Sequence, residues 1–271
     1  MRWRTRVAML LVAGVLSAGA AMAHVGTGIA VDAQGRVWVG DTSGNRLWRI
    51  ERNGKLTQVA SNVHSNVVAL SPDAGVYVEN DRHTDRWPAG LLHVDAQGGV
   101  YSAADSEEAK SLTEARGLAE RSGLSNVNSM VRAHDGSLFL RACNSLYRVT
   151  STGKATEMPG GKEAGFLGKK DADCRRILGL AVDDAGSLYV ANYGKSSVFK
   201  LTPRGTTEIL MHSRRPWVPT GVAVSGNDIY VLERFGHPYG VISGISGMMP
   251  ARFRVTKIAG NGKKTILATI R

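Results

Sequence analysis

The 271-residue sequence lacks the short motifs by which many enzymes are identified. It contains no G-x-S-x-G, no H-E-x-x-H and no C-x-x-C pair, and "GNGKKT" at Gly260 falls in a turn between strands rather than at the strand-to-helix junction of a phosphate loop. It also lacks a long Lys/Arg run and a basic stretch interleaved with aromatic residues. The formal net charge of +11 therefore favours solubility, or attraction to an anionic envelope surface, over nucleic-acid binding.

Residues 1–23 have the three parts of a secretory signal peptide. Arginines at positions 2, 4 and 6 form a basic head, Val7 to Leu16 form a short apolar run, and Ala21-Met22-Ala23 is a small-x-small cleavage site. The apolar run is too short to span a membrane, which disfavours the alternative of an N-terminal anchor. We expect a mature chain of residues 24–271 that has no transmembrane segment and is periplasmic or extracellular. Because the leader holds three arginines and no acid, the mature chain keeps +8 of the +11 charges.

The mature sequence repeats one pattern of short strands five times. First strands read GIAV, VVAL, NSMV, GLAV and GVAV, and begin at Gly28, Val67, Asn128, Gly179 and Gly221. Each is followed by a turn such as DAQG or DDAG, a second strand such as RVWVGD, a third such as RLWRI and a fourth such as LTQVA. Nearly uniform apolarity in the first strands indicates buried inner positions, and alternation in the later strands indicates partial exposure.

Four antiparallel strands recurring about every 40 to 60 residues are typical of the blades of a β-propeller. The sequence therefore predicts an all-β, monomeric, single-domain propeller over residues 24–271, with five readable repeats and hence five or six blades. The phrases GIAVDAQGRVWVGDTSGNRLWRI, GLAVDDAGSLYVANYGKSSVFKL and PTGVAVSGNDIYVLE resemble NHL repeats. More broadly they are similar to the six-bladed group of gluconolactonase/regucalcin-like, paraoxonase-like and strictosidine-synthase-like proteins. The resemblance covers nearly the whole mature chain and implies the fold, which hosts many activities.

The predicted loops differ in length between the two faces of the propeller. Turns joining first to second and third to fourth strands are short, as in DAQG, STG and AGNG, and most contain glycine. The long segments all belong to the other face, and they cover residues 80–90, 105–125, 159–177 and 234–251. We therefore expect any functional site on this loop-rich face, around the mouth of the central tunnel. The Gly-rich apolar segment 239–253 suits a ligand or protein partner, or folds back over the rim.

The segment DSEEAKSLTEARGLAERSG is predicted to be a helical insertion. Asp105 or Ser106 can cap it, two glutamates suit its N-terminal end, and Gly123 ends it. An apolar side, formed by Ala109, Leu112, Ala115, Leu118 and Ala119, predicts a helix lying flat on the propeller face. Two interpretations stay open, a packed insertion and a lid.

Polar residues next to the first and second strands point toward the predicted mouth. Of these, Asn66, Glu79, Asn128, Asn192 and Glu233 are the candidate ligand-binding residues. The resembling calcium-dependent lactonases and esterases use a Glu and several Asn or Asp at the mouth, so the resemblance implies a possible calcium site of Glu79, Asn128, Asn192 and Glu233. The alternative is structural, since Asp41, Asn144 and Asn192 stand where turn-forming residues bond their own backbone.

The sequence has only two cysteines. Cys143 ends the second strand of the third repeat, and Cys174 precedes the first strand of the fourth, so both are placed on the loop-rich face of neighbouring blades. In the oxidising compartment that the leader implies, we expect a Cys143–Cys174 disulfide. Two free thiols, or Cys143 as a nucleophile beside Asn144, are the alternatives.

These observations favour a secreted or periplasmic binding or scaffold protein that uses its loop-rich face to hold a small molecule or an envelope protein. Nucleic acid is not an expected partner. The alternative function is a calcium-dependent hydrolase of a lactone or ester, as the resemblance implies, and catalytic residues for it are not identified. No cofactor follows with certainty from the sequence, and calcium is the one that the resemblance implies.

Overall fold

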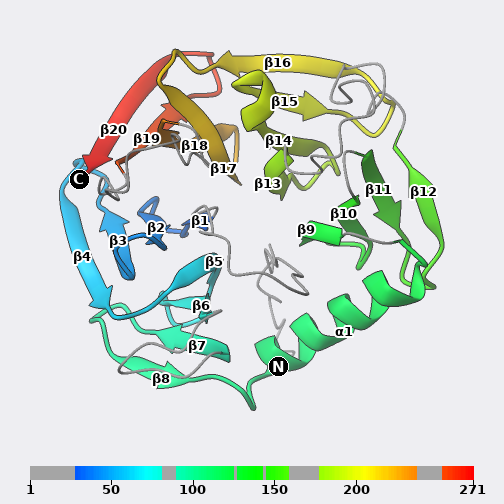
Figure 1. Ribbon diagram of the computed structural model, residues 1–271, viewed down its shortest axis with the longest axis horizontal. Helices are drawn as coiled ribbons and strands as arrows, with labels where there is room; N and C mark the ends of the chain where they lie inside the picture. Colours follow the sequence, from blue (N-terminus) through cyan, green and yellow to red (C-terminus); the bar gives the residue numbers. More distant parts are fainter. Residues whose placement is uncertain (1–27, 81–89, 125–126, 143–144, 159–176, 237–251) are drawn as a thin grey trace, which may run out of the picture.

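The computed structural model describes residues 28–80, 90–124, 127–142, 145–158, 177–236 and 252–271. Their strands form five four-stranded antiparallel sheets arranged in a ring (Figure 1). This confirms the predicted all-β propeller, and the number of blades is five. No helix among these residues is both long enough and apolar enough to cross a membrane.

The sheets follow the sequence repeat strand for strand. Blade one contains β1 (Ile29–Val31), β2 (Val37–Asp41), β3 (Arg46–Ile50) and β4 (Leu56–Ser61). Blade two contains β5 (Ser65–Leu70), β6 (Val76–Asn80), β7 (Gly90–Val94) and β8 (Val100–Ser102). Blade three contains β9 (Val127–Arg132), β10 (Leu138–Ala142), β11 (Ser145–Val149) and β12 (Ala155–Glu157).

The last two blades have the same order of strands. Blade four contains β13 (Ile177–Val182), β14 (Leu188–Asn192), β15 (Ser197–Leu201) and β16 (Thr207–His212), with a short 3₁₀ helix η1 (Tyr193–Lys195) between β14 and β15. Blade five contains β17 (Trp217–Ser225), β18 (Asp228–Phe235), β19 (Phe253–Ile258) and β20 (Lys264–Ile270). Every residue of β13 is buried, whereas β20 is mostly exposed, as the apolarity of first and fourth strands predicts.

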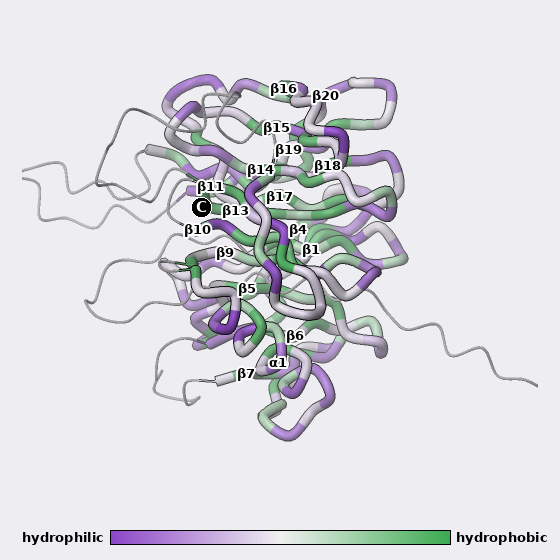
Figure 2. The backbone as a smooth tube through the Cα atoms, turned by 90° about the vertical axis from the view of Figure 1, so that its right-hand side faces the viewer, coloured by the Kyte–Doolittle hydropathy of each residue, from purple (hydrophilic) through white to green (hydrophobic). Residues whose placement is uncertain are grey.

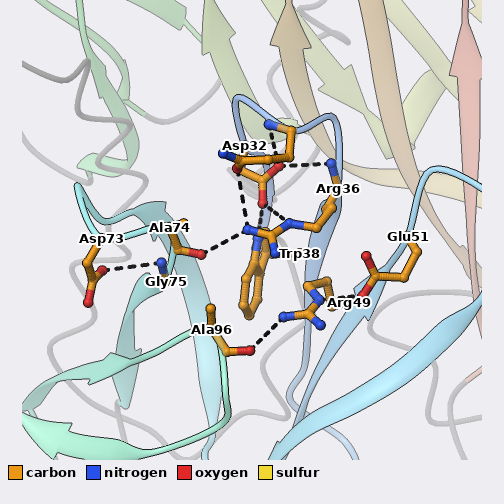
Figure 3. Close-up of polar contacts among 10 residues, drawn as sticks. Asp32, Arg36, Trp38, Arg49, Glu51, Asp73, Ala74, Gly75 and Ala96 are labelled. Atoms are coloured by element: carbon orange, nitrogen blue, oxygen red, sulfur yellow. Dashed lines mark hydrogen bonds and ion pairs between the residues drawn. The ribbon is translucent and has the colours of Figure 1, made fainter.

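A carboxylate, an aromatic ring and a cation contact one another on the short-turn face of several blades. In blade one, Asp32 accepts hydrogen bonds from Trp38 Nε1 at 3.0 Å and from Arg36 Nε at 2.6 Å (Figure 3). The guanidinium of Arg49 lies 5.2 Å from the Trp38 ring centroid and donates to the carbonyl of Ala96 in blade two. Blades three, four and five repeat the motif as Asp135, Phe139 and Arg148, as Asp183, Tyr189 and Lys200, and as Asp228, Tyr230 and Lys257.

Packing between sheets, rather than a shared strand, closes the ring. Each sheet consists of four strands consecutive in sequence. Blades five and one meet in a buried cluster that includes Ile29, Val39, Leu232 and Phe253. The inner strands β13 and β17 approach so closely that a Cβ added to Gly179 would lie 2.7 Å from Gly221 Cα. Glycine is therefore required at this contact by the proximity of two backbones.

One helix, α1 (Glu107–Arg121), occupies the sector between blades two and three (Figure 1). Ser106 caps it by accepting from the Ala109 backbone N–H, as predicted, and Gly123 follows its end with a φ of +71°. Leu112, Ala115, Leu118 and Ala119 pack into a cluster with blade three, so α1 is a packed insertion. Ala109 is only half-buried, and the fifth buried residue is instead Glu108.

Candidate functional site

The described strand ends on the loop-rich face carry many buried polar side chains. Figure 2 shows apolar strand segments in the interior and hydrophilic turns toward the two faces of the ring. On the loop-rich face, Asp41 holds the β2–β3 turn by accepting from the Gly44 N–H at 2.8 Å, and it pairs with Arg46 at 2.7 Å. Asn192 likewise accepts from the Lys195 N–H at 3.0 Å and caps η1. For these two residues the structural alternative, bonding to the nearby backbone, is observed; Asn144 lies outside the described residues.

Each of the two predicted glutamates has a guanidinium partner. The carboxylate of Glu79 pairs with Arg116 of α1 and lines a cleft between blade two and that helix. The carboxylate of Glu233 is fully buried and accepts from Arg254 Nε at 2.7 Å and Nη2 at 2.9 Å, as well as from Thr256 Oγ1 at 2.6 Å. Glu79 faces Arg116 of α1, and Glu233 faces Arg254 of β19, the third strand of blade five. The structure therefore does not bring the two glutamates together.

The remaining candidates add little to a cation site. Asn66 and Asn128 lie on β5 and β9, and their side chains are outside what the structure describes. Across the described part of the chain, no group of three or more His, Cys, Asp or Glu side chains is placed to hold a metal ion. Cys143 and Cys174 both lie outside the described residues.

One edge of blade five presents aromatic rings at the loop-rich face. Trp217 begins β17 and Phe235 ends β18, and the two residues are paired in register. Their rings meet edge to face, with centroids 5.3 Å apart. Backbone hydrogen bonds fix this edge, since the Phe235 N–H donates to Arg252 O and the Gly236 N–H donates to Pro216 O, each at 2.8 Å. Trp217 is half-buried, whereas Phe235 is 41% exposed.

Arginines surround these rings. Arg252 lies over Phe235 at 5.6 Å from the ring centroid, and Arg254 lies over Trp217 at 4.5 Å. Arg254 is neutralised by Glu233, whereas the exposed Arg214, Arg215 and Arg252 have no ion pair with a described carboxylate. The adjoining sequence 237–251 contains no Asp or Glu. We call the five residues Arg214, Arg215, Trp217, Phe235 and Arg252 the blade-five platform.

Arg234, which precedes Phe235 on β18, is a half-buried cation. Arg234, on β18, is buried enough that desolvation lowers the pKa of its guanidinium, while the charge of Asp41 acts in the opposite direction. The sequence analysis singled out the segment 239–253, which contains Arg252, but missed the other four platform residues. The sequence RRPW at Arg214, in the connection between blades four and five, was the available signal.

Among known proteins, the chain is similar only to solved structures, and at low sequence identity. No protein-family model matches the sequence, and no curated protein matches it. Among solved structures, the chain is similar to a catalytically inactive virginiamycin B lyase from Staphylococcus aureus, with 12% identity, a TM-score of 0.46, and coverage of 94% of this chain and 87% of that one. It is also similar to a gluconolactonase from Xanthomonas campestris, with 16% identity, a TM-score of 0.41, and coverage of 90% and 76%. For regucalcin from Agrobacterium tumefaciens the identity is 16%, the TM-score 0.37, and the coverage 87% and 83%.

Proposed function

We propose that the protein is an exported binding or scaffold protein whose blade-five platform holds an acidic segment of a protein partner. The observation that carries this proposal is the set of three exposed arginines without a described counter-charge, next to the exposed Phe235 and the half-buried Trp217 on a hydrogen-bonded edge. Export rests on the leader, residues 1–23, which lies outside the described residues.

The charge balance around the aromatic rings supports the choice of this surface. On the short-turn face the cations that lie over aromatic rings are matched by turn carboxylates, as in Lys257 with Asp228 at 2.6 Å and Arg148 with Asp135, whereas exposed lysines such as Lys55 and Lys263 have no described ion pair there. The platform arginines lack such partners among the described residues. The charges of these arginines are therefore not compensated at the loop-rich face, and they can attract and orient an acidic partner.

The side chains of the platform are those that contribute most at protein interfaces. Trp and Arg are over-represented among residues whose truncation weakens binding strongly, and Arg presents a planar fork that fits a carboxylate. The two rings offer apolar contact area at low entropy cost, because backbone hydrogen bonds already hold the strand ends that carry them. An acidic segment with apolar or aromatic side chains would satisfy both parts of the platform.

The alternative function, calcium-dependent hydrolysis of a lactone or ester, would require cation ligands at the mouth. Both candidate glutamates are engaged by arginine in the described structure, and no cluster of ligands replaces them there. If calcium were nevertheless bound and needed, its removal would lower the melting temperature and abolish hydrolysis together, because a bound ion stabilises the folded state. A melt unaffected by chelator would leave the binding function alone.

We predict that removing the platform charges weakens binding of an acidic peptide specifically. The probe is a fluorescein-labelled peptide of alternating Glu and Leu or Tyr, titrated with protein at physiological salt and followed by anisotropy. The variant R214A/R215A/R252A should bind about 100-fold more weakly, since each rim arginine contributes roughly 1 kcal/mol. The matched variant K55A/K263A/K264A removes three exposed charges from the short-turn face and should stay within about twofold of the unchanged protein. Equal loss in both variants would show attraction by net charge only and would refute the proposal.

We also predict that Cys143 and Cys174 are disulfide-bonded in the mature protein. Titration of thiols in protein denatured without reductant should find none. A bridge closing about 30 residues would stabilise the fold by roughly 3–4 kcal/mol in the chain-entropy model, so reductant should lower the melting temperature. Two reactive thiols per chain would contradict the pairing, and a reactive Cys143 alone would favour the enzyme alternative.

A further inference from the structure

We propose that the partner of the blade-five platform is a second copy of this chain, which presents an acidic and aromatic patch at the short-turn end of blade two. This inference rests on the function proposed for the platform and names the partner that the platform holds. In place of the monomer expected from the sequence, it gives a weak head-to-tail association, in which the loop-rich face of one copy meets the short-turn face of the next.

The patch is a row of aromatic rings flanked by two carboxylates. Tyr77, His93 and Tyr101 are paired in register across β6, β7 and β8, so their side chains share one face of the sheet. The centroid of the His93 ring lies 5.2 Å from that of Tyr77 and 6.2 Å from that of Tyr101. His93 Nε2 is 3.1 Å from Asp73 Oδ1, and the Tyr101 hydroxyl donates to Asp95 at 3.3 Å. We call these five residues the blade-two patch.

The blade-two patch is a version of the motif of carboxylate, ring and cation in which a histidine replaces the permanent cation. In the other four blades the cross-strand partner of the ring is an arginine or a lysine, namely Arg49, Arg148, Lys200 and Lys257. In blade two this position holds His93. The outer turns of the other blades, ERNGK, TSTGK, TPRGT and AGNGK, each contain a lysine or an arginine, whereas DAQGG of blade two contains neither. Blade two therefore has the ring and the carboxylates without a lysine or arginine of its own.

Nearby arginines of blade one do not neutralise the patch. Arg36 and Arg49 donate to backbone carbonyls in the two turns of blade two, at 3.2 Å and 2.8 Å (Figure 3). Each is already ion-paired within blade one, Arg36 with Asp32 and Arg49 with Glu51. No described lysine or arginine forms an ion pair with either patch carboxylate. The patch is therefore a local excess of negative charge on a strongly basic chain.

Both patch carboxylates are ionised at neutral pH, and the patch is exposed. Burial acts to raise the pKa of Asp73, but hydrogen bonds, of which that from Ser71 is the largest, outweigh it and lower that pKa. A hydrogen bond from the Gly99 N–H lowers the pKa of Asp95. The side chain of Asp73 is 54% exposed, and Tyr101 is 53% exposed. The patch therefore presents negative charge and aromatic surface to a partner.

The blade-five platform has the groups that the patch lacks. Its three arginines have no described counter-charge, and arginine both stacks on aromatic rings and pairs with carboxylates through its planar fork. Four blades place a cation over a ring and beside a turn carboxylate within one chain, and the contact repeats this arrangement between two chains. Platform and patch lie on opposite faces of the ring. Each copy therefore offers its platform to one neighbour and its patch to another, so the contact is heterologous and extends into a chain of copies.

Sedimentation velocity of the mature protein tests the proposal. At low ionic strength the sedimentation coefficient should rise with protein concentration, and the rise should vanish in about 1 M salt, where the Debye length falls to roughly 3 Å. Asp73→Asn/Asp95→Asn keeps side-chain oxygens that accept from the turn N–H groups, and it should weaken association about tenfold. The matched variant Glu107→Gln/Glu114→Gln removes two exposed acids from α1 and should leave association unchanged.

Mixing two variants tests the head-to-tail geometry. D73N/D95N keeps the platform and loses the acidic patch, whereas R214A/R215A/R252A keeps the patch and loses the charged platform. At a concentration where the unchanged protein forms chains, each variant alone should sediment as a monomer. An equimolar mixture should form pairs and no chains, because only the platform of the first variant and the patch of the second make an intact contact. Recovery in the mixture also shows that both variants are folded.

The proposal is overturned if the unchanged protein stays monomeric at every concentration, if D73N/D95N associates as strongly as the unchanged protein, if the α1 variant loses association equally, or if the mixture stays monomeric. Titration with the labelled acidic peptide separates these results from the proposed function, since D73N/D95N should bind the peptide as tightly as the unchanged protein does. Peptide binding by a protein that never self-associates would leave the platform's function standing and refute only the second copy as its partner. Failure of the unchanged protein to bind the peptide would refute the platform's function and this inference with it.

Discussion

Replacing Glu233 with alanine should reduce the free energy of unfolding by about 3 kcal/mol, because it leaves a guanidinium without its partner in a mostly buried position. Glu233 is fully buried, and Arg254 is 18% exposed at its side chain. Three hydrogen bonds end on the Glu233 carboxylate, two from Arg254 and one from Thr256. Urea unfolding at pH 7 measures the loss.

Two comparisons make the Glu233 result specific. Glu233→Gln keeps an acceptor for Thr256 and should lose less stability than the alanine variant. Glu107→Ala breaks an exposed pair with Lys110 and should change stability by less than about 0.5 kcal/mol. If Glu233→Ala were as stable as the unchanged protein and had lost a bound metal, Glu233 would be a ligand at the mouth, as the sequence suggested, rather than part of the blade.

Replacing Gly179 with alanine should destabilise the propeller by about 3 kcal/mol or prevent folding, since the new methyl group meets backbone that no side-chain rotation can move. The added Cβ would lie 2.7 Å from Gly221 Cα and 3.0 Å from both Thr220 O and Val222 N. These atoms join the inner strands of blades four and five, so relief requires the blades to separate.

Gly117→Ala in α1 is the matched control for Gly179→Ala. An added Cβ there meets only Arg121 Nη1, at 3.2 Å, the end of a flexible side chain. Since alanine has a higher helix propensity than glycine, the free energy of unfolding of this variant should rise by about 0.5–1 kcal/mol. Equal stability of Gly179→Ala and the unchanged protein would show that the inner strands are not in the tight contact described here.

The elements that could be predicted from sequence are those fixed by local chemistry. Strand alternation, turn glycines and the Ser106 cap are properties of neighbouring residues, and the repeat made them readable. Asp41 and Asn192 fall in the same group, because each bonds a backbone N–H three residues on. The five readable repeats match the five blades, but the sequence left a sixth blade open. The sector filled by α1 depends on packing between distant segments.

The partners of the candidate site residues could not be read from sequence in the same way. Glu79 and Arg116 are 37 residues apart, and only the placement of α1 against blade two joins them. The burial of Glu108 follows from that same placement. The Glu233–Arg254 pair is different, since these residues face each other in the β18–β19 register. Aligning the two strands by their apolar residues would have predicted it.

Photo-crosslinking from the two faces tests the central claim most directly. A photoreactive phenylalanine analogue is placed at Phe235, on the platform, or at Asn261, exposed in a turn of the opposite face, and each protein is irradiated with the labelled acidic peptide. The account predicts that the peptide is captured from position 235 and not from position 261, and that R214A/R215A/R252A abolishes the capture. Capture from position 261 with none from position 235 would place the binding surface on the short-turn face and contradict the account.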